Sequence, residues 1–245
     1  MWYDLGMNEN KKQLSSKLFS MLAVAVMVGI FTIGVGVAIF FALNNEEPTV
    51  VRPSDPYRYV EDKPVIYLYP EEETEIEVKL GAPEKITVDY PDYNGGWKVL
   101  AQPDGTLTMN GDKYYALYYE AEFDKLERAE DGFVLSNDGV EDFLDDKLEY
   151  LGLNYREREE FITYWASQLE QSPYVYIRFM TASEIEAQMP LEVTPKPKTT
   201  IRVIMQFENL NAPIEVEEQR LDKAARDGYT LVEWGGVNLG AKDEK

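Results

Sequence analysis

The sequence contains neither histidine nor cysteine among its 245 residues. This excludes Ser-His-Asp catalysis, thiol nucleophiles and the usual ligand sets of zinc, haem and iron–sulfur clusters. Catalysis by carboxylates, lysine or tyrosine stays open, although no catalytic residue, metal site or cofactor is assigned. The chain can form no disulfide, and it has no residue that could carry the lipid of a lipoprotein.

Positive charge is also scarce. The chain has 24 Lys and Arg residues against 45 Asp and Glu, which gives a net charge of −21. Such a surface repels nucleic acid and anionic lipid headgroups, so we expect no nucleic-acid partner. It is compatible with cationic partners or divalent cations. The simplest explanation for most of the acidic residues, however, is that they form a solvated surface.

One long apolar run is present, at residues 18–43, and it contains no charged residue. Because a spanning helix needs about 20 apolar residues, the run predicts a single transmembrane helix in contact with the lipid bilayer. A buried core helix is an alternative, but it would rarely be uncharged on every face for so long. A cleaved signal peptide is another, but its apolar region is only about 7 to 15 residues long. The best cleavage site, after Ala42, would also place Phe40 where a small residue belongs.

The charges around this helix indicate its orientation. Lys11, Lys12 and Lys17 precede it, while Arg52, Arg58 and Lys63 follow it. The positive-inside rule slightly favours a cytoplasmic N-terminal tail at residues 1–17 and an extracytoplasmic main domain at the cell membrane.

The helix contains small residues spaced four apart. These are Ala25 with Gly29, and Gly34 with Ala38. This spacing lets two helices approach closely and indicates a homo-oligomer formed through the helix. The alternative is that glycine and alanine are simply common in spanning helices.

The remainder divides into a Pro-rich tether at 44–63, an α+β domain at 64–236 and a charged tail at 237–245. The domain is predicted to be β-rich, with about nine strands and an inserted helical hairpin. The expected strands are 64–69, 74–80, 85–90, one beginning near Trp97, 106–109, 113–120, 174–180, 200–207 and 229–234. The first is apolar on both faces and suits a central strand, whereas the second alternates as a half-solvated strand does.

The hairpin is expected at 138–151 and 155–171, where apolar residues recur at helical spacing. Asp138 is predicted to cap the first helix, and Gly152 to end it in a left-handed conformation. Asn154 is predicted to cap the second, with Glu157 at the reciprocal position of a capping box. Prolines between 180 and 200 indicate an irregular loop.

Aromatic residues supply the candidate binding surface. In the strand 113–120, Leu117 marks one face as the core side, so Tyr115 and Tyr119 are predicted to be buried. The opposite face would expose Tyr114, Tyr118 and Glu120. Two tryptophans beside glycine pairs are also expected to reach the surface, so the candidate surface comprises Tyr114, Tyr118, Glu120, Trp97 and Trp234. Exposed rings suit sugars or extended peptides, and the alternative is that all these rings pack in the core.

Two other chemistries fit short stretches of the sequence. Glu120 and Glu122 resemble the carboxylate pair of a glycosidase, although an acidic chain offers many such pairs. Asn137, Asp138 and Asp142 could offer oxygen ligands to calcium, but their spacing is not that of an EF-hand loop, and helix capping is the simpler role.

Several segments, taken together, resemble a family of uncharacterised bacterial extracytoplasmic proteins, many of them lipoproteins or membrane-anchored. The segments are KPVIYLYPEEETEIEVKL, YNGGWKVLAQPDGTL, EYLGLNYREREEFITYW, LEVTPKPKTTIRV and LVEWGG. The resemblance covers about residues 63 to 236 and implies an envelope location. It brings no activity and no catalytic residues.

These observations predict a membrane-anchored, extracytoplasmic, non-catalytic binding or assembly module. Its partner would be an envelope glycan or protein. The alternative is a carboxylate-dependent hydrolase acting on envelope glycan.

The predicted topology can be tested with introduced thiols, because the chain has no cysteine of its own. In intact cells, a membrane-impermeant maleimide should label Thr200→Cys and leave Asn8→Cys unlabelled. Lysed cells should show labelling of both. Labelling of residue 8 alone in intact cells would reverse the orientation.

Overall fold

The computed structural model describes residues 59–124 and 126–240. The predicted N-terminal tail, the transmembrane segment 18–43, tether residues 44–58 and tail residues 241–245 lie outside these ranges. Within them, no helix has the length and apolar character needed to cross a membrane.

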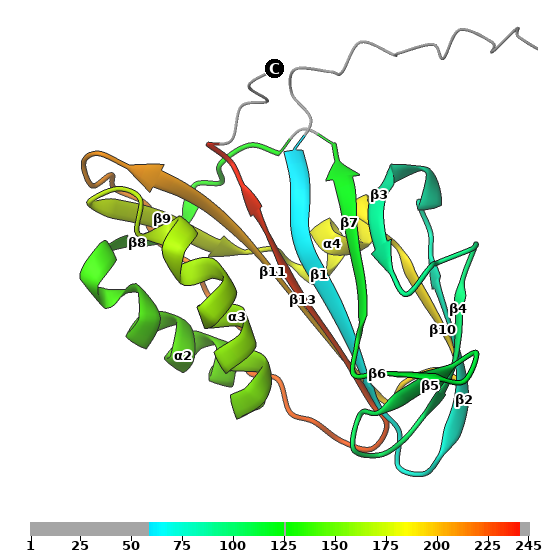
Figure 1. Ribbon diagram of the computed structural model, residues 1–245. Helices are drawn as coiled ribbons and strands as arrows, with labels where there is room; N and C mark the ends of the chain where they lie inside the picture. The colour runs from blue at the N-terminus through cyan, green and yellow to red at the C-terminus, as the bar shows by residue number, and fades with distance from the viewer. Residues whose placement is uncertain (1–58, 125, 241–245) are drawn as a thin grey trace, which may run out of the picture. The chain divides into compact units, whose positions relative to one another are not determined.

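The domain has three layers: a helical pair, a large mixed sheet and a smaller antiparallel sheet (Figure 1). The large sheet has eight strands in the order β12-β8-β9-β11-β13-β1-β7-β3. Their bounds are β1 Tyr59–Tyr69, β3 Ile86–Tyr90, β7 Leu117–Phe123, β8 Asp131–Ser136, β9 Tyr174–Phe179, β11 Thr199–Leu210, β12 Glu217–Glu218 and β13 Thr230–Asn238. Neighbours are antiparallel except β11–β13 and the short β12–β8 pair.

The second sheet has five strands in the order β10-β2-β4-β5-β6, all antiparallel. Their bounds are β2 Thr74–Leu80, β4 Trp97–Ala101, β5 Leu107–Met109, β6 Asp112–Tyr114 and β10 Leu191–Thr194. The helices are α2 Val140–Tyr150, α3 Tyr155–Leu169 and α4 Ala182–Gln188, with short 3₁₀ turns at Pro83–Lys85 and Asn137–Gly139.

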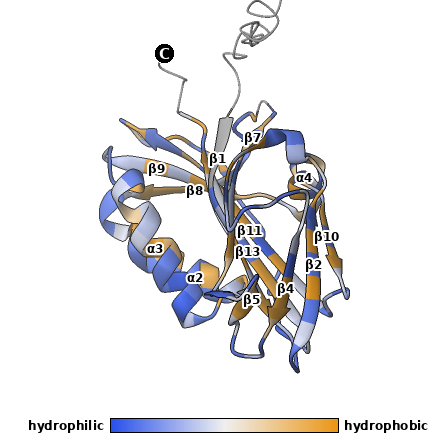
Figure 2. Ribbon diagram, turned by 45° about the vertical axis from the view of Figure 1, so that its right-hand side comes forward, coloured by the Kyte–Doolittle hydropathy of each residue, from blue (hydrophilic) through white to orange (hydrophobic). Residues whose placement is uncertain are grey.

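Two hydrophobic cores lie on opposite faces of the large sheet. One fills the space between the two sheets and contains Ile66 and Leu68 of β1 together with Ile76 of β2. The other lies under α2 and α3 and contains Val65 and Tyr67 of β1. The strand 64–69 is therefore central and buried on both faces, as its sequence predicts. In Figure 2 the strands of both sheets carry many apolar residues, while α2 and α3 show many hydrophilic ones.

The helical hairpin forms where it is predicted. Asn154 caps α3, and its side chain and that of Glu157 form the reciprocal bonds of a capping box. Glu157 is fully buried and also receives two hydrogen bonds from Arg226, at 2.8 and 3.0 Å. Gly152 has φ +94° and ends α2, with hydrogen bonds from Gly152 and Leu153 back into the helix.

The predicted cap of α2 is wrong. The helix begins at Val140, and its N-cap residue Gly139 provides no side-chain cap. Asp138 lies instead in the preceding 3₁₀ turn, where its carboxylate accepts a hydrogen bond from the Ser136 hydroxyl. The 3₁₀ turn thus moves the helix start past the residue that could have capped it.

Thirteen strands occur in the described residues, more than the nine or so predicted. The additional strands include β8 and β10, and α4 occupies part of the expected irregular loop. Strand β1 begins at Tyr59, inside the stretch assigned to the tether, and β13 runs on to Asn238. Short strands such as β10 pair with segments distant in sequence, so local patterns do not reveal them.

Gly235 and Gly236 do not form a turn but lie inside β13. A Cβ atom on Gly236 would approach Trp165 Cζ2 to 2.7 Å, closer than packing allows. The absence of a side chain there lets the indole ring of α3 rest directly on the strand. This packing explains why residue 236 is a glycine without a turn.

The two faces of β7 should differ in their contribution to stability. Tyr119 is fully buried and its hydroxyl donates to Glu233 at 2.8 Å, whereas Tyr118 is half-buried. Tyr119→Ala should lower the free energy of unfolding by about 3–5 kcal/mol, the cost of truncating a buried ring. Tyr118→Ala should cost clearly less in the same denaturation experiment. Equal losses would show that both faces are packed alike.

Candidate functional site

The tyrosine-rich stretch 113–120 is not one strand. Strand β6 ends at Tyr114 in the five-stranded sheet, and β7 begins at Leu117 in the eight-stranded sheet. Tyr115 lies in the break and is 56% exposed, so the prediction that it is buried is wrong. Alternation holds only within a strand, and within β7 it does hold: Leu117 and Tyr119 are buried.

Strand β1 carries a bulge beside this break. Its register with β13 shifts between Asp62 and Val65, and its register with β7 shifts between Glu61 and Val65. Lys63 lies within the bulge and has φ +54°, a left-handed conformation that is unusual for a residue other than glycine. Its ammonium nitrogen lies 4.3 Å from the ring centroid of Tyr164 on α3. The bulge therefore directs a lysine over an aromatic ring.

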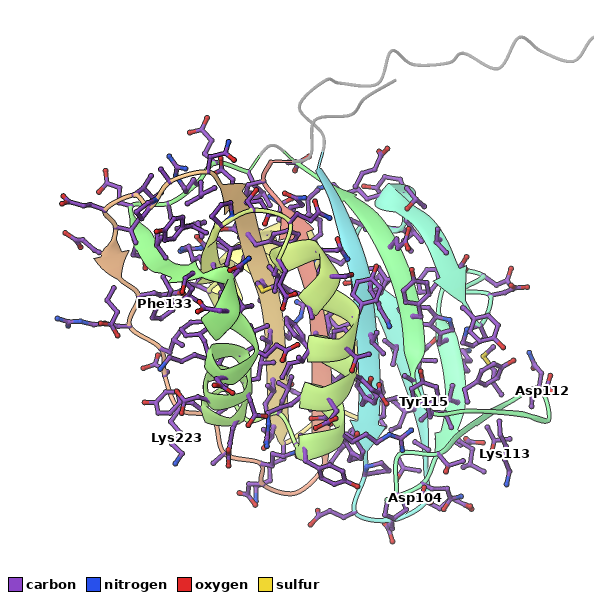
Figure 3. All side chains as sticks on the ribbon, turned by 60° about the vertical axis from the view of Figure 1, so that its left-hand side comes forward. Asp104, Asp112, Lys113, Tyr115, Phe133 and Lys223 are labelled. Atoms are coloured by element: carbon purple, nitrogen blue, oxygen red, sulfur yellow. The ribbon has the colours of Figure 1, made fainter. Side chains whose placement is uncertain are left out.

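The break and the bulge border a pocket of about 600 Å³. This volume is within the range of roughly 300–1,000 Å³ that is common for small-molecule sites. Figure 3 shows Tyr115 at the base of the strands, with Lys113 and Asp112 farther out on the β5–β6 hairpin. We call this the tyrosine pocket, and it is lined by Lys63, Val65, Tyr90, Lys113, Tyr114, Tyr115, Ala116, Tyr118 and Tyr164.

The exposed ring of Tyr115 lies close to two other side chains. The guanidinium carbon of Arg156 lies 5.3 Å from its ring centroid, and the ring of Tyr67 lies 6.3 Å away. Glu160 joins these two side chains, because it accepts a hydrogen bond from the Tyr67 hydroxyl and one of 3.1 Å from Arg156 Nε. Tyr115 is thus a surface ring that packs beside a hydrogen-bonded group of side chains.

Burial perturbs two titratable groups at this site. It raises the pKa of Tyr67 well above its ordinary value, and the neighbouring Glu160 carboxylate raises it further. Burial also lowers the pKa of Lys63, while the Coulombic attraction of Glu160 opposes that decrease. The phenol of Tyr67 is therefore a hydrogen-bond donor at neutral pH and not a base.

The structure brings together only part of the predicted binding surface. Tyr114 and Tyr118 line the tyrosine pocket, and Glu120 accepts a hydrogen bond from the Tyr118 hydroxyl without lining the pocket. The expected exposure of Trp97 and Trp234 is wrong, because both rings are fully buried. Trp97 Nε1 donates to the Pro91 carbonyl at 2.6 Å inside the inter-sheet core, whereas Trp234 packs under α3.

Seven residues of the pocket were not part of the predicted surface: Lys63, Val65, Tyr90, Lys113, Tyr115, Ala116 and Tyr164. The ring of Tyr90 is 62% exposed and meets Tyr114 edge to face, with their centroids 5.5 Å apart. Of these, only Lys113, Tyr115 and Ala116 lie in the tyrosine-rich stretch itself. Tyr90 belongs to β3 and Tyr164 to α3, and no local sequence pattern links these two segments to the tyrosine-rich stretch.

The structure gives no geometric support to the glycosidase and calcium-binding hypotheses. Glu120 and Glu122 share one face of β7, and neither lines the tyrosine pocket. Within residues 59–124 and 126–240, no cluster of three or more acidic side chains is arranged to hold a metal ion. Asp138, the central residue of the candidate calcium stretch, is engaged by Ser136.

Comparison with known proteins gives one partial match. A Butyrivibrio fibrisolvens protein named "Uncharacterized protein in bglA 3'region" is 41% identical over 63 residues, which are 24% of this chain and 66% of that protein. The match spans just under two thirds of the relative, whose name states no activity. No protein-family profile and no solved structure matches the chain. The chain is therefore similar, over about a quarter of its length, to an uncharacterised bacterial protein.

Glu160 should raise the pKa of Lys63 against the lowering effect of burial. Because its carboxylate raises the pKa of the ammonium group, Glu160→Gln should lower the pKa of Lys63 below its value in the unmodified protein. A ¹³C NMR titration of the lysine Cε, assigned with Lys63→Arg, would measure this. Glu159→Gln, at an exposed neighbouring position of α3, is the matched control and should leave the titration unchanged. An unchanged pKa of Lys63 in Glu160→Gln would show that the two groups are not electrostatically coupled.

Proposed function

We propose that the chain is a single-pass membrane protein whose β-rich domain is an extracytoplasmic, non-catalytic binding module. Residues 18–43 would anchor it, with residues 1–17 in the cytoplasm. The tyrosine pocket would be the ligand site, and a saccharide of the bacterial envelope would be the ligand.

The observation that carries this proposal is the convergence of tyrosine rings from separate elements on one pocket. Tyr90 comes from β3, Tyr114 from β6, Tyr118 from β7 and Tyr164 from α3, while Tyr115 lies in the break. Exposed aromatic rings cost free energy in water, and here two of them, Tyr90 and Tyr115, are more than half exposed. A ligand that covers these rings would recover that free energy.

The chemistry of the lining suits a saccharide. Tyrosine offers an apolar ring face together with a hydroxyl that both donates and accepts hydrogen bonds. A pyranose presents the matching combination, since its C–H groups form an apolar face and its hydroxyls lie around the rim. Support of Tyr115 by Arg156 and Tyr67 limits the ordering that binding would require.

The lining also argues for binding rather than hydrolysis. Glycoside hydrolysis by carboxylates needs two of them facing each other across the substrate, about 5 to 10 Å apart. The described residues that line the tyrosine pocket include no aspartate or glutamate. A non-catalytic site fits this composition better.

Truncation of one exposed ring tests the proposal. The full chain in nanodiscs should bind members of an array of neutral and acidic envelope oligosaccharides. Tyr115→Ala should weaken that binding about tenfold or more, as truncation of a central binding tyrosine does.

Tyr155→Ala is the matched control. This tyrosine is 75% exposed at the start of α3 and does not line the pocket. It should bind as the unmodified chain does, and both variants should keep the melting temperature. Equal effects of the two substitutions, or no bound saccharide, would refute the proposal.

A further inference from the structure

The tyrosine pocket differs in charge from the rest of the chain. Acidic residues outnumber basic ones almost two to one overall, at 45 against 24. The described lining of the pocket reverses this balance: it contains Lys63 and Lys113 and no carboxylate. The charged groups that line the pocket are therefore cationic, although the carboxylates of Glu160 and Asp112 lie close enough behind the lining to act on Lys63 and Tyr114. Two lysines in the lining are unexpected if neutral sugars are the only ligands.

Lys63 has an energetically unfavourable backbone conformation. A lysine in a left-handed conformation, at φ +54°, carries a backbone cost that a glycine would avoid. The same bulge interrupts the pairing of β1 with both neighbours. The result is an ammonium group 4.3 Å from the ring centroid of Tyr164 and 5.6 Å from that of Trp234.

Among the residues whose side chains the structure describes, 63–124 and 126–240, no ion pair of Lys63 occurs. Glu160, which forms an ion pair with Arg156, acts on Lys63 through a Coulombic interaction. The ammonium group of Lys63 is half-buried and has lost part of its hydration. An anion placed beside it would therefore be held more strongly than at the open surface.

From these observations we infer that the ligand carries a carboxylate, so that the pocket selects acidic saccharides such as uronic or muramic acids. This inference rests on the proposed function, and it assigns separate roles within the pocket. The rings of Tyr90 and Tyr115 cover the apolar faces of the sugar. Lys63 and Lys113 bind its carboxylate.

A matched pair of probes tests the carboxylate directly. Tri-galacturonic acid and the disaccharide of N-acetylglucosamine and N-acetylmuramic acid are each compared with their methyl esters, which keep the rings and lose the charge. The full chain in nanodiscs should bind at least one acid roughly tenfold or more tightly than its ester, the size expected for a charge-assisted hydrogen bond. Raising the salt concentration should weaken binding of the acid and leave binding of the ester nearly unchanged.

Variants assign the effect to the two lysines. Lys63→Gln and Lys113→Gln should each reduce the preference for the acid, and Lys63→Arg, which has the same backbone constraint and keeps the charge, should retain it. Lys98→Gln is the control for an exposed lysine, because Lys98 lies on β4 outside the pocket lining.

The outcomes separate the two proposals. Equal binding of acid and ester, lost in Tyr115→Ala, would overturn the acidic specificity and leave the saccharide site intact. A preference for the acid that survives both lysine-to-glutamine variants would also overturn it. Failure of every acid, ester and array saccharide to bind would refute the proposed function itself.

Discussion

The burial of β1 on both faces and both edges is the constraint on which the rest of the domain depends. The strand pairs with β13 on one side and β7 on the other. Its alternate side chains enter the two cores, with Ile66 and Leu68 on one side and Val65 and Tyr67 on the other. A strand so enclosed fixes the position of both covering layers. In a domain without disulfides, this continuous apolar contact is the main source of stability.

The candidate site lies where this arrangement is interrupted. The bulge at Lys63 lies in β1, and the break at Tyr115 immediately precedes β7, the strand that pairs with β1 beside the bulge. Regular pairing there would return both side chains to ordinary alternation. The irregular backbone instead places a cation and an exposed ring beside the same pocket. The stability of the adjacent cores allows the sheet to tolerate these two irregularities.

Local sequence patterns predict the strands and helices that pack into a core. They do not predict the irregular segments that form the candidate site. The double-sided apolar pattern of 64–69 and the capping box at Asn154 are local signals, and both are confirmed. The prediction for Tyr115 fails because strict alternation does not continue across a break between two sheets. The prediction for Trp234 fails because Gly236 allows packing against Trp165 and does not form a turn. Such distinctions depend on partners far away in sequence, which a local pattern does not contain.

The pocket walls come from all three layers, and this bears on how a ligand would be bound. Tyr164 belongs to the helical layer, Tyr118 to the large sheet and Tyr114 to the small one. Each wall is attached to a packed core, so the rings cannot shift independently without disturbing that core. Preorganised walls reduce the entropy lost on binding and favour ligands of fixed shape, such as pyranose rings, over flexible peptides. The same rigidity limits how far Lys63 and Lys113 can move toward a carboxylate at a different position on the sugar. The position of the carboxylate should therefore matter as much as its presence.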